Sequence, residues 1–179
     1  MRSFMDAVSV VDFPNARYFA EDLFRESFNS DFPTPPMLST SAGVQEAART
    51  WHQYVAFYKW SETHIEPVGF CNWIRHDDVY LEGGMCVRRN FYRRLPKDQW
   101  AQCKQLGGIA QIVMETAATE LNDAQAWFGY CGDKKAFIVD SRVGYVPTRH
   151  SFLIVKWYRD LSMSQKQALE DKIAVLGPF

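Results

Sequence analysis

The sequence predicts an α/β protein with a mixed sheet flanked by helices, in a single domain over residues 1–179. A length of 179 residues suits one domain. Aromatic residues make up 15% of the chain and favour strands, which indicates a substantial sheet. Amphipathic stretches and short apolar runs follow one another in the order helix, three strands, helix, strand, helix, strand, helix.

The first part of the chain predicts a helix over Asn15–Phe28, because apolar residues recur on one face and Asn15 can cap it. Three prolines fall within Ser30–Ala42 and indicate a loop that is long enough to form a lid or a substrate wall. A short second helix is expected over Gln45–His52.

Three β-type runs come next, and they cover Tyr54–Trp60, Val68–Arg75 and Val79–Val87. Polar, turn-forming residues separate them, which predicts an antiparallel meander. After a basic stretch, Gly107-Gly108 opens a helix whose apolar residues recur at helical spacing, namely Ile109, Ile112, Val113, Thr116, Ala117 and Leu121.

The last third of the chain predicts two strands and two helices. The strand expected over Ala126–Tyr130 follows a crossover helix, so it can lie parallel to the strand at 79–87. A helix over Asp133–Val143 would end at Gly144. A strand over Phe152–Tyr158 and a final helix over Ser164–Val175, capped by Ser164, complete the order.

Composition excludes several classes of function. With 20 basic and 21 acidic side chains, the protein is not a polybasic binder of nucleic acid or anionic lipid over its whole surface. The four cysteines lack a CxxC pair and predict reduced thiols in a cytoplasmic protein. No apolar run approaches the ~20 residues of a membrane span. The four histidines lack metal-binding spacing, so no metal is expected.

The segment from Gln105 to Ala110 lies between a strand and an amphipathic helix. The N–H groups of a helix N-terminus bind phosphate, and glycines let a ligand approach the backbone. An ordinary Gly-Gly turn at the start of a helix is the alternative interpretation. Neither a P-loop nor the three-glycine dinucleotide fingerprint is present.

Three motifs together resemble the GNAT acyltransferase family, over roughly Val55 to Tyr158. The pattern Gln-x-x-Gly-x-Ala at 105–110 resembles the acyl-CoA-binding signature of that family. Asp133-Lys-Lys-Ala136, followed by Gly144-Tyr145, is similar to its Asn-x-x-Ala helix that closes with Gly-Phe. Met85-Cys86-Val87, with residues 88–92 after it, resembles the end of its fourth strand.

The resemblance implies a GNAT-like fold and direct attack by a primary amine on the thioester of acetyl-CoA or another acyl-CoA. The acceptor would be a small-molecule or peptide amine, without nucleic acid or membrane as partner, and a homodimer is compatible with the fold. It implies that the backbone N–H of Val87 polarises the thioester and that Gly107, Gly108 and Ala110 hold the pyrophosphate. The full set of implied CoA-binding residues is Cys86, Val87, Arg88, Gln105, Gly107, Gly108, Ile109, Ala110, Asp133 and Ala136.

The candidate catalytic residues match the family pattern only in part. Glu82 stands where the family often places its general base, and its alternative is an ordinary strand-end glutamate. Many members carry a general-acid tyrosine four residues before the Gly-Phe pair, but this chain has Asp140 there. A carboxylate donates a proton poorly at neutral pH unless burial raises its pKa. Tyr130 or Tyr145 could substitute for it.

Three further groups of residues have alternative interpretations. His150 is a reserve candidate for the general base. Cys86 or Cys131 could form a nucleophilic Cys-His pair, and the alternative interpretation is that both are inert buried thiols. The insertion Arg94–Lys104 departs from the family pattern. The aromatic side chains that either shape the acceptor pocket or pack in the core are Trp51, Tyr58, Trp60 and Trp73.

Basic residues interleaved with aromatic residues between Arg88 and Lys104 allow three interpretations: single-stranded nucleic-acid binding, recognition of the CoA 3′-phosphate and adenine, or a solvated face. The residues concerned are Arg88, Arg89, Arg93, Arg94, Lys97 and Lys104, with Phe91, Tyr92 and Trp100. A GNAT-fold protein that binds acyl-CoA or a protein partner without catalysis is the alternative to an acyltransferase.

Overall fold

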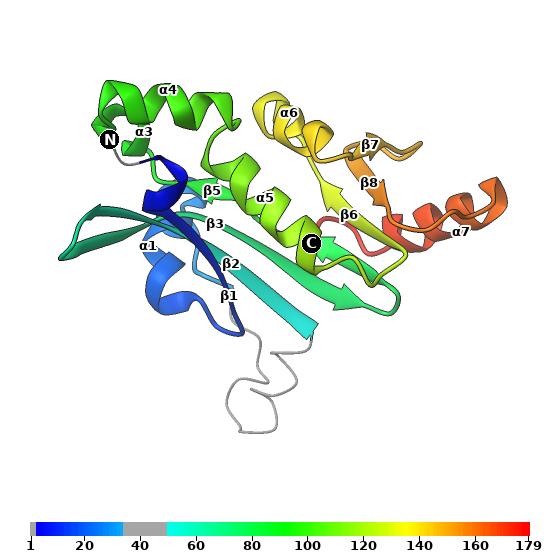
Figure 1. Cartoon of the computed structure of the whole chain (residues 1–179). Helices are drawn as coiled ribbons and strands as arrows, with labels where there is room; N and C mark the ends of the chain where they lie inside the picture. Colours follow the sequence, from blue (N-terminus) through cyan, green and yellow to red (C-terminus); the bar gives the residue numbers. More distant parts are fainter. Residues whose placement is uncertain (1–2, 34–49) are drawn as a thin grey trace.

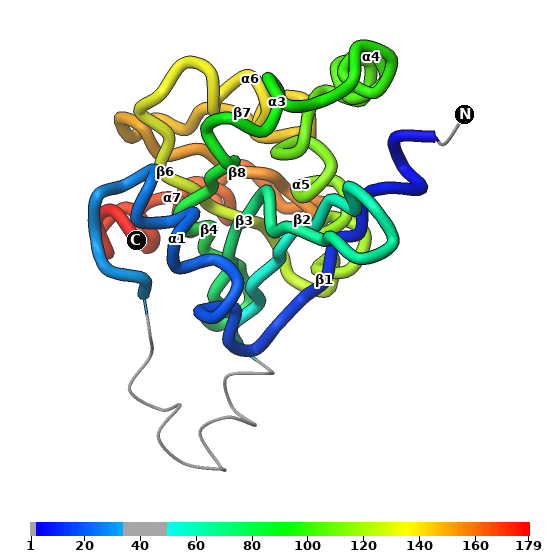
Figure 2. Tube along the Cα trace, turned by 90° about the vertical axis from the view of Figure 1, so that its left-hand side faces the viewer, coloured from blue at the N-terminus to red at the C-terminus, as the bar shows by residue number. Residues whose placement is uncertain are grey.

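A computed structural model describes residues 3–33 and 50–179 of the protein. The strands in these residues form one eight-stranded sheet. Its order is β1 (Val8–Phe13), β2 (Trp51–Ser61), β3 (His64–His76), β4 (Val79–Glu82), β6 (Ala126–Tyr130), β8 (Leu153–Trp157) and β7 (Val146–Pro147), and β5 (Cys86–Val87) pairs with β3 beside this path. Helices cover both faces, and α1 and α5 lie on opposite sides of β2 and β3 (Figures 1 and 2). The predicted mixed sheet flanked by helices is therefore confirmed.

The N-terminal part holds the short 3₁₀ turn η1 (Met5–Ala7), β1 (Val8–Phe13) and α1 (Arg17–Phe28). The sequence interpretation missed β1, an edge strand whose side chains are all at least partly exposed, although its valines have the β-branched shape that favours strands. Helix α1 begins two residues later than predicted. Asn15 still stabilises its first turn, because its Oδ1 accepts the Arg17 N–H at 3.1 Å.

The expected loop and second helix fall mostly on residues 34–49, which lie outside the described residues. Residues 30–33 have no regular helix or strand. Trp51 and His52, which were assigned to the end of that helix, belong instead to β2 (Trp51–Ser61). Both pair with residues of β3, so long-range pairing decides the conformation of this segment.

Strands β2, β3 (His64–His76) and β4 (Val79–Glu82) form the predicted antiparallel meander. Successive side chains of β2 reach opposite faces of the sheet. Tyr54 packs in the cluster under α5, whereas Val55 packs in the cluster under α1. Because both faces are covered, these strands have longer apolar runs than a half-exposed sheet requires.

The strand predicted over 79–87 is in fact two strands, β4 and the two-residue β5 (Cys86–Val87). The Gly83 N–H still donates to the Asn72 carbonyl at 2.9 Å, but a Cβ at Gly83 would lie 2.5 Å from the Asn72 amide nitrogen. A Cβ at Gly84 would lie 3.0 Å from the Phe28 ring. The two glycines therefore let the backbone pass closely between β3 and α1 while it leaves the β4 line.

Strand β6 (Ala126–Tyr130) pairs in parallel with β4, as predicted, from Val79–Ala126 to Glu82–Gly129. Beyond these pairs the two partners separate. Strand β5 stays with β3, and β6 continues with β8 (Leu153–Trp157). The middle of the sheet therefore opens on the carboxyl side of Glu82 (Figure 1).

The insertion at 94–104 is largely helical, which the sequence interpretation did not predict. It follows α3 (Phe91–Arg94) and contains most of α4 (Lys97–Gln105). Arg94 ties the segment to the β2–β3 hairpin, because its guanidinium lies 4.4 Å from the Trp60 ring centroid and 2.7 Å from a Glu66 oxygen. Pro96 before the helix was the available signal for its start.

Helix α5 (Ile109–Glu120) confirms the predicted apolar stripe, since Ile109, Ile112, Val113 and Ala117 are all buried. Helix α6 (Lys134–Arg142) is one residue shorter at each end than predicted, because Asp133 and Val143 are its caps. Strand β7 (Val146–Pro147) was too short to be recognised.

At the C-terminal end, β8 starts one residue later than predicted because Phe152 has φ +65°, outside the extended region. Helix α7 (Met163–Ala174) is capped by Ser162 rather than by Ser164. Ser162 forms a reciprocal capping box with Gln165, which satisfies two backbone N–H groups at once and so outcompetes the later serine.

One close approach supports the N-terminus of α5. A Cβ at Gly69 of β3 would overlap the Cγ2 methyl of Ile109, a fully buried side chain whose β-branch restricts its rotamers. We expect Gly69→Ala to lower the free energy of unfolding by about 1–3 kcal/mol, the usual range for overpacking. Gly132→Ala is the control, because the nearest side-chain atom, on the Phe152 ring, would lie 3.9 Å from its Cβ. Urea denaturation that finds both variants equally stable would contradict this packing argument.

Candidate active site

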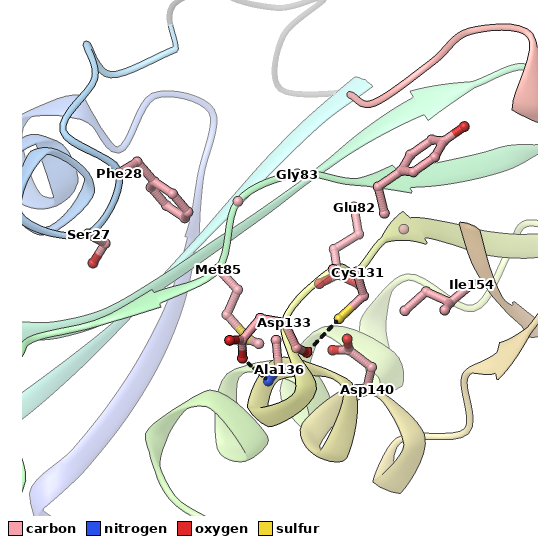
Figure 3. Close-up of a pocket in the computed structure, with 14 residues that line it drawn as sticks. Ser27, Phe28, Glu82, Gly83, Met85, Cys131, Asp133, Ala136, Asp140 and Ile154 are labelled. Carbon is pink, nitrogen blue, oxygen red and sulfur yellow. Dashed lines mark hydrogen bonds between the residues drawn. The ribbon is translucent and has the colours of Figure 1, made fainter. Parts of the chain in front are cut away.

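A cavity of about 380 Å³ lies where β4 and β6 separate (Figure 3). The end of α1 closes one side of it and α6 closes the other. The cavity reaches into the middle of the sheet because β5 and β6 do not pair with each other beyond Glu82 and Gly129. Its lining residues are Ser27, Phe28, Glu82, Gly83, Gly84, Met85, Gly129, Tyr130, Cys131, Gly132, Asp133, Ala136, Asp140 and Ile154.

Glu82 is the last residue of β4, and its side chain lines this cavity while the residue is only 7% exposed. One carboxyl oxygen accepts from the Cys71 thiol at 3.8 Å. The other, Oε2, has no hydrogen-bond partner among the described residues. Burial, followed by the charge of Asp140, raises the pKa of Glu82 to about 8. The residue nominated as base is therefore buried and titrates near neutral pH.

Asp140 reaches the same cavity from the last turn of α6 and is 2% exposed. Burial raises the pKa of Asp140 to about 6. Its Oδ1 also has no partner in the part of the chain that the structure describes. A carboxyl group can donate a proton near neutral pH only if burial raises its pKa, and Asp140 is buried in this way.

Of the two tyrosines nominated as substitutes for the general acid, Tyr130 is directed elsewhere, whereas the Tyr145 phenol adjoins the Glu82 carboxyl group. Tyr130 lines the cavity, but its hydroxyl donates to the Ala174 carbonyl at 3.4 Å and its ring packs against Phe179. Tyr145 lies beside Glu82 but outside the cavity lining. Burial and the neighbouring charge of Glu82 raise the pKa of Tyr145 well above its ordinary value, which makes it a weaker proton donor.

The cysteine and histidine alternatives receive no support. Burial raises the pKa of Cys86 and of Cys131 to about 12, so both remain thiols rather than nucleophilic thiolates. His150 pairs with Asp171 at 2.8 Å outside the cavity. Among residues 3–33 and 50–179, no group of three or more histidine, cysteine or acidic side chains is arranged to hold a metal ion.

The glycine pair of the acyl-CoA signature has a different local role from the predicted one. The Gly107 N–H donates to the Lys104 carbonyl at 3.1 Å, and the Gly108 N–H donates to the Cys103 carbonyl at 2.9 Å. With φ +81° at Gly107, these bonds form the Schellman cap of α4. In this structure the two amides are therefore committed to the inserted helix, as in the alternative Gly-Gly turn, and not directed at a pyrophosphate.

The first turn of α5 nevertheless has unsatisfied donors. The Ile109 N–H donates to the Tyr92 hydroxyl at 3.1 Å, but the Ala110 and Gln111 amides have no recorded acceptor in the described part of the chain. A second cavity of about 320 Å³ lies at this end of the helix, and it is lined by Tyr92, Trp100, Lys104, Gly107, Gly108 and Arg142. Two cations and a positive helix end therefore meet there.

Arg142 was not nominated from the sequence, because the last turn of a predicted helix gives no sign of its neighbours. Figure 1 shows α4 and α6 on the two sides of the N-terminal end of α5, which brings Lys104 and Arg142 to one cavity. This proximity depends on the inserted helix and could not be read from local spacing.

The backbone N–H of Val87 is not used in the pairing of β5 with β3. The Arg88 N–H donates to the Val68 carbonyl at 2.9 Å, which makes Val87 and Gly69 a non-hydrogen-bonded pair. The Val87 N–H consequently points away from β3, toward the side of β5 where β6 does not pair with it. An N–H group there can donate to a ligand.

The four aromatic side chains considered for an acceptor pocket do not line the main cavity. Trp51, Tyr58 and Trp73 are at most 4% exposed, and Trp60 packs under Arg94. Two residues of the basic segment, Arg88 and Arg94, share Glu66 as a partner at 3.1 and 2.7 Å. For these residues the structure favours packing over ligand contact.

No protein-family model matches the chain, and no curated protein matches it significantly. Many solved structures are similar to it, and three of them serve as examples. The first is the ribosomal-protein-S18-alanine N-acetyltransferase of Escherichia coli, with TM-score 0.54 and 8% identity over 87% of this chain and 97% of the other. The second is a GNAT-family protein of Desulfovibrio desulfuricans, with TM-score 0.51 and 13% identity over 86% and 100%.

The chain has the GNAT fold. The third similar structure, a Pyrococcus horikoshii protein assigned to the acetyltransferases, has TM-score 0.52 and 16% identity over 79% of this chain. The chain spans 44% of the length of that protein. Identities this low establish the GNAT fold and leave the roles of individual residues to the geometry of the site. No described helix is long and apolar enough to cross a membrane.

The buried carboxyl group of Glu82 should make stability depend on pH. A carboxyl group whose pKa is raised from 4.5 to about 8 binds its proton more tightly in the folded state, so stability falls as pH rises between these values. We expect Glu82→Gln to melt close to the parent at pH 4.5 and at least about 3 °C above it at pH 8.5, since 1 kcal/mol shifts Tm by about 2–4 °C in a domain of this size. Differential scanning fluorimetry measures both.

Glu170→Gln in α7 is the matched control, because Glu170 lies outside the cavity. It should melt in parallel with the parent across the same range. A melting difference between Glu82→Gln and the parent that stays constant from pH 4.5 to 8.5 would show that Glu82 is not held protonated by burial.

Proposed function

We propose that the protein transfers an acetyl or other short acyl group from acyl-CoA to a primary amine. The observation that carries this proposal is the cavity at the separation of β4 and β6, with the buried Glu82 carboxyl group on one side and the outward Val87 N–H on the strand that continues from it. The GNAT fold, shared with N-acetyltransferases, supports the same reaction class.

Acyl-CoA would supply an activated thioester carbonyl. The side chain of Glu82, in its ionised form, takes the proton that an ammonium group must lose before its nitrogen can attack. The Val87 N–H donates to the oxygen that gains negative charge, and a fixed donor of this kind needs no reorganisation during the reaction. Gly83 and Gly84 keep the wall of the cavity free of side chains, so an extended ligand can pass along it.

Helix α6 connects the two cavities. Ala136 and Asp140 line the cavity at Glu82, and Arg142 lines the one at the start of α5. A rise of 1.5 Å per residue places these positions within about 9 Å along the helix axis. An extended ligand can therefore reach both, with its phosphates near Lys104, Arg142 and the Ala110 amide. The other implied CoA-binding residues, such as Gln105 and Asp133, stay predictions.

A binder of acyl-CoA without catalysis is the second candidate. It is favoured by Asp140, which stands where the family often has its general-acid tyrosine. The Schellman cap and the Tyr92 hydroxyl at the Ile109 amide engage three amides of the phosphate signature, which weakens acyl-CoA binding in either case. The nucleic-acid interpretation is weaker, because Arg88 and Arg94 are engaged by Glu66. Binding and turnover must therefore be measured separately.

The direct test combines a thermal shift with a thiol assay. Acetyl-CoA should raise the melting temperature, because a ligand that binds only the folded state stabilises it. A panel of primary amines should then release free thiol with at least one member. Stabilisation without thiol release would indicate the non-catalytic binder. If neither acetyl-CoA nor CoA shifts the melting temperature, the proposal is wrong.

The phosphate site has its own prediction. We expect Lys104→Ala and Arg142→Ala each to weaken CoA binding roughly tenfold, which corresponds to about 1.4 kcal/mol for one lost charged contact. Arg93→Ala is the control, because Arg93 is exposed and lines neither cavity. Isothermal titration calorimetry at low salt gives the three dissociation constants. Equal affinities for all three variants would place the phosphates elsewhere.

A further inference from the structure

We propose that Glu82 and Asp140 form one proton-transfer pair, so that Asp140, and neither Tyr130 nor Tyr145, completes the acid-base chemistry of this site. This inference rests on the proposed function. It assigns a reacting role to the residue whose identity departs from the family pattern.

The first argument is geometric. Glu82 comes from β4 and Asp140 from α6, and both line the same cavity while almost fully buried. Figure 3 shows the Glu82 side chain extending from its strand toward Cys131 and Asp140. Two carboxyl groups from separate elements thus line one cavity.

The second argument comes from hydrogen bonding. Glu82 Oε2 and Asp140 Oδ1 are buried and have no partner among the described residues. An unsatisfied buried polar atom costs about 1–3 kcal/mol, more when it is charged. No hydrogen bond joins the two carboxyl groups directly, so two such atoms at one cavity are explained if a bound water or substrate carries the proton between them.

The surroundings do not neutralise the pair. Cys71 of β3 donates its thiol to Glu82, the Tyr145 phenol lies beside Glu82, and the Cys131 thiol lies beside Asp140. None of these groups is a cation. Asp133 also lines the cavity, but its carboxylate accepts the Lys135 and Ala136 amides at the start of α6, and these bonds lower its pKa.

Two buried carboxyl groups without a cation cannot both ionise easily, so they titrate as a pair. The pKa of Glu82 is raised to about 8 and that of Asp140 to about 6, in both cases first by burial. Near pH 7 the pair therefore holds one proton, which lies mainly on Glu82, and the form with ionised Glu82 and protonated Asp140 is the minor one of the same total charge. One member can accept a proton while the other can donate one, as general acid-base catalysis at neutral pH requires.

The proton balance of amine acylation fits such a pair. The ionised carboxylate takes one proton from the ammonium group, and the amine lone pair then forms the C–N bond. When the C–S bond breaks, its electrons leave with sulfur, which takes a proton from a carboxyl group of the pair. The remaining extra proton on the amide nitrogen passes to the pair and then to water. The net products are the amide, free thiol and one proton.

The test compares Asp140→Asn and Glu82→Gln with two exposed or half-exposed controls of the same chemistry, Asp160→Asn and Glu170→Gln. The rate kcat is measured against pH with acetyl-CoA and the best amine of the panel. The parent should give a bell-shaped profile. Each cavity variant should lose at least about 10²-fold in kcat and one limb of the bell, whereas the controls should keep both.

A second readout needs no turnover. The ¹³C chemical shift of the Glu82 carboxyl carbon is followed against pH in the parent and in Asp140→Asn. Removing the like charge should lower the pKa of Glu82, whereas Asp160→Asn should leave it unchanged. Circular dichroism confirms that each variant is folded.

The outcomes separate the two proposals. If Asp140→Asn keeps the kcat and the bell-shaped profile of the parent, the pair is wrong and acyl transfer stands. If the Glu82 titration is the same in Asp140→Asn and the parent, the carboxyl groups do not share a proton and the pair is overturned. If the parent releases no thiol with any amine, the proposed function fails and the catalytic pair fails with it, while the titration still decides whether a proton is shared.

Discussion

The candidate site depends on one backbone constraint, the passage of Gly83 and Gly84 between β3 and α1. A side chain at Gly83 would meet the Asn72 amide, and one at Gly84 would meet the Phe28 ring. Only this close path lets the chain leave the β4 line and rejoin β3 as β5. Because β6 remains with β8, two parallel neighbours separate after four paired residues, and the space between them becomes the cavity. The enclosure of Glu82 and the outward Val87 N–H both follow from it.

Burial then determines the chemistry of that space. A carboxyl group at the end of β4 would ionise readily in water, but here it shares a covered cavity with a second carboxyl group from α6. The charged form loses hydration and meets a like charge, so protons are retained at higher pH. Such an arrangement lowers stability wherever both groups would ionise, and perturbed groups of this kind cluster at functional sites because the chemistry requires them.

The inserted helix α4 shows why a motif and its mechanism must be examined separately. Gln105, Gly108 and Ala110 stand at the spacing of an acyl-CoA signature, and a helix does begin there. Yet the glycine amides terminate α4, because a helix that ends immediately upstream leaves carbonyl groups that need donors. The same insertion brings Lys104 to the cavity that Arg142 lines, and Tyr92 of α3 places its hydroxyl at the Ile109 amide. The anion-binding character of this end is thus assembled from different groups.

The sequence by itself determined the elements whose signals are local and periodic. The stripe of α5, the meander of β2 to β4 and the parallel placement of β6 follow from side-chain period and chain order, which short-range sterics impose. Only the tertiary structure decided that the run at 79–87 breaks in two, that β1 and β7 join the sheet, and that Asp140 meets Glu82 while the Tyr130 hydroxyl turns toward α7. These outcomes depend on contacts between residues tens of positions apart, and no local pattern records which of them will share a cavity, lose water and change its pKa.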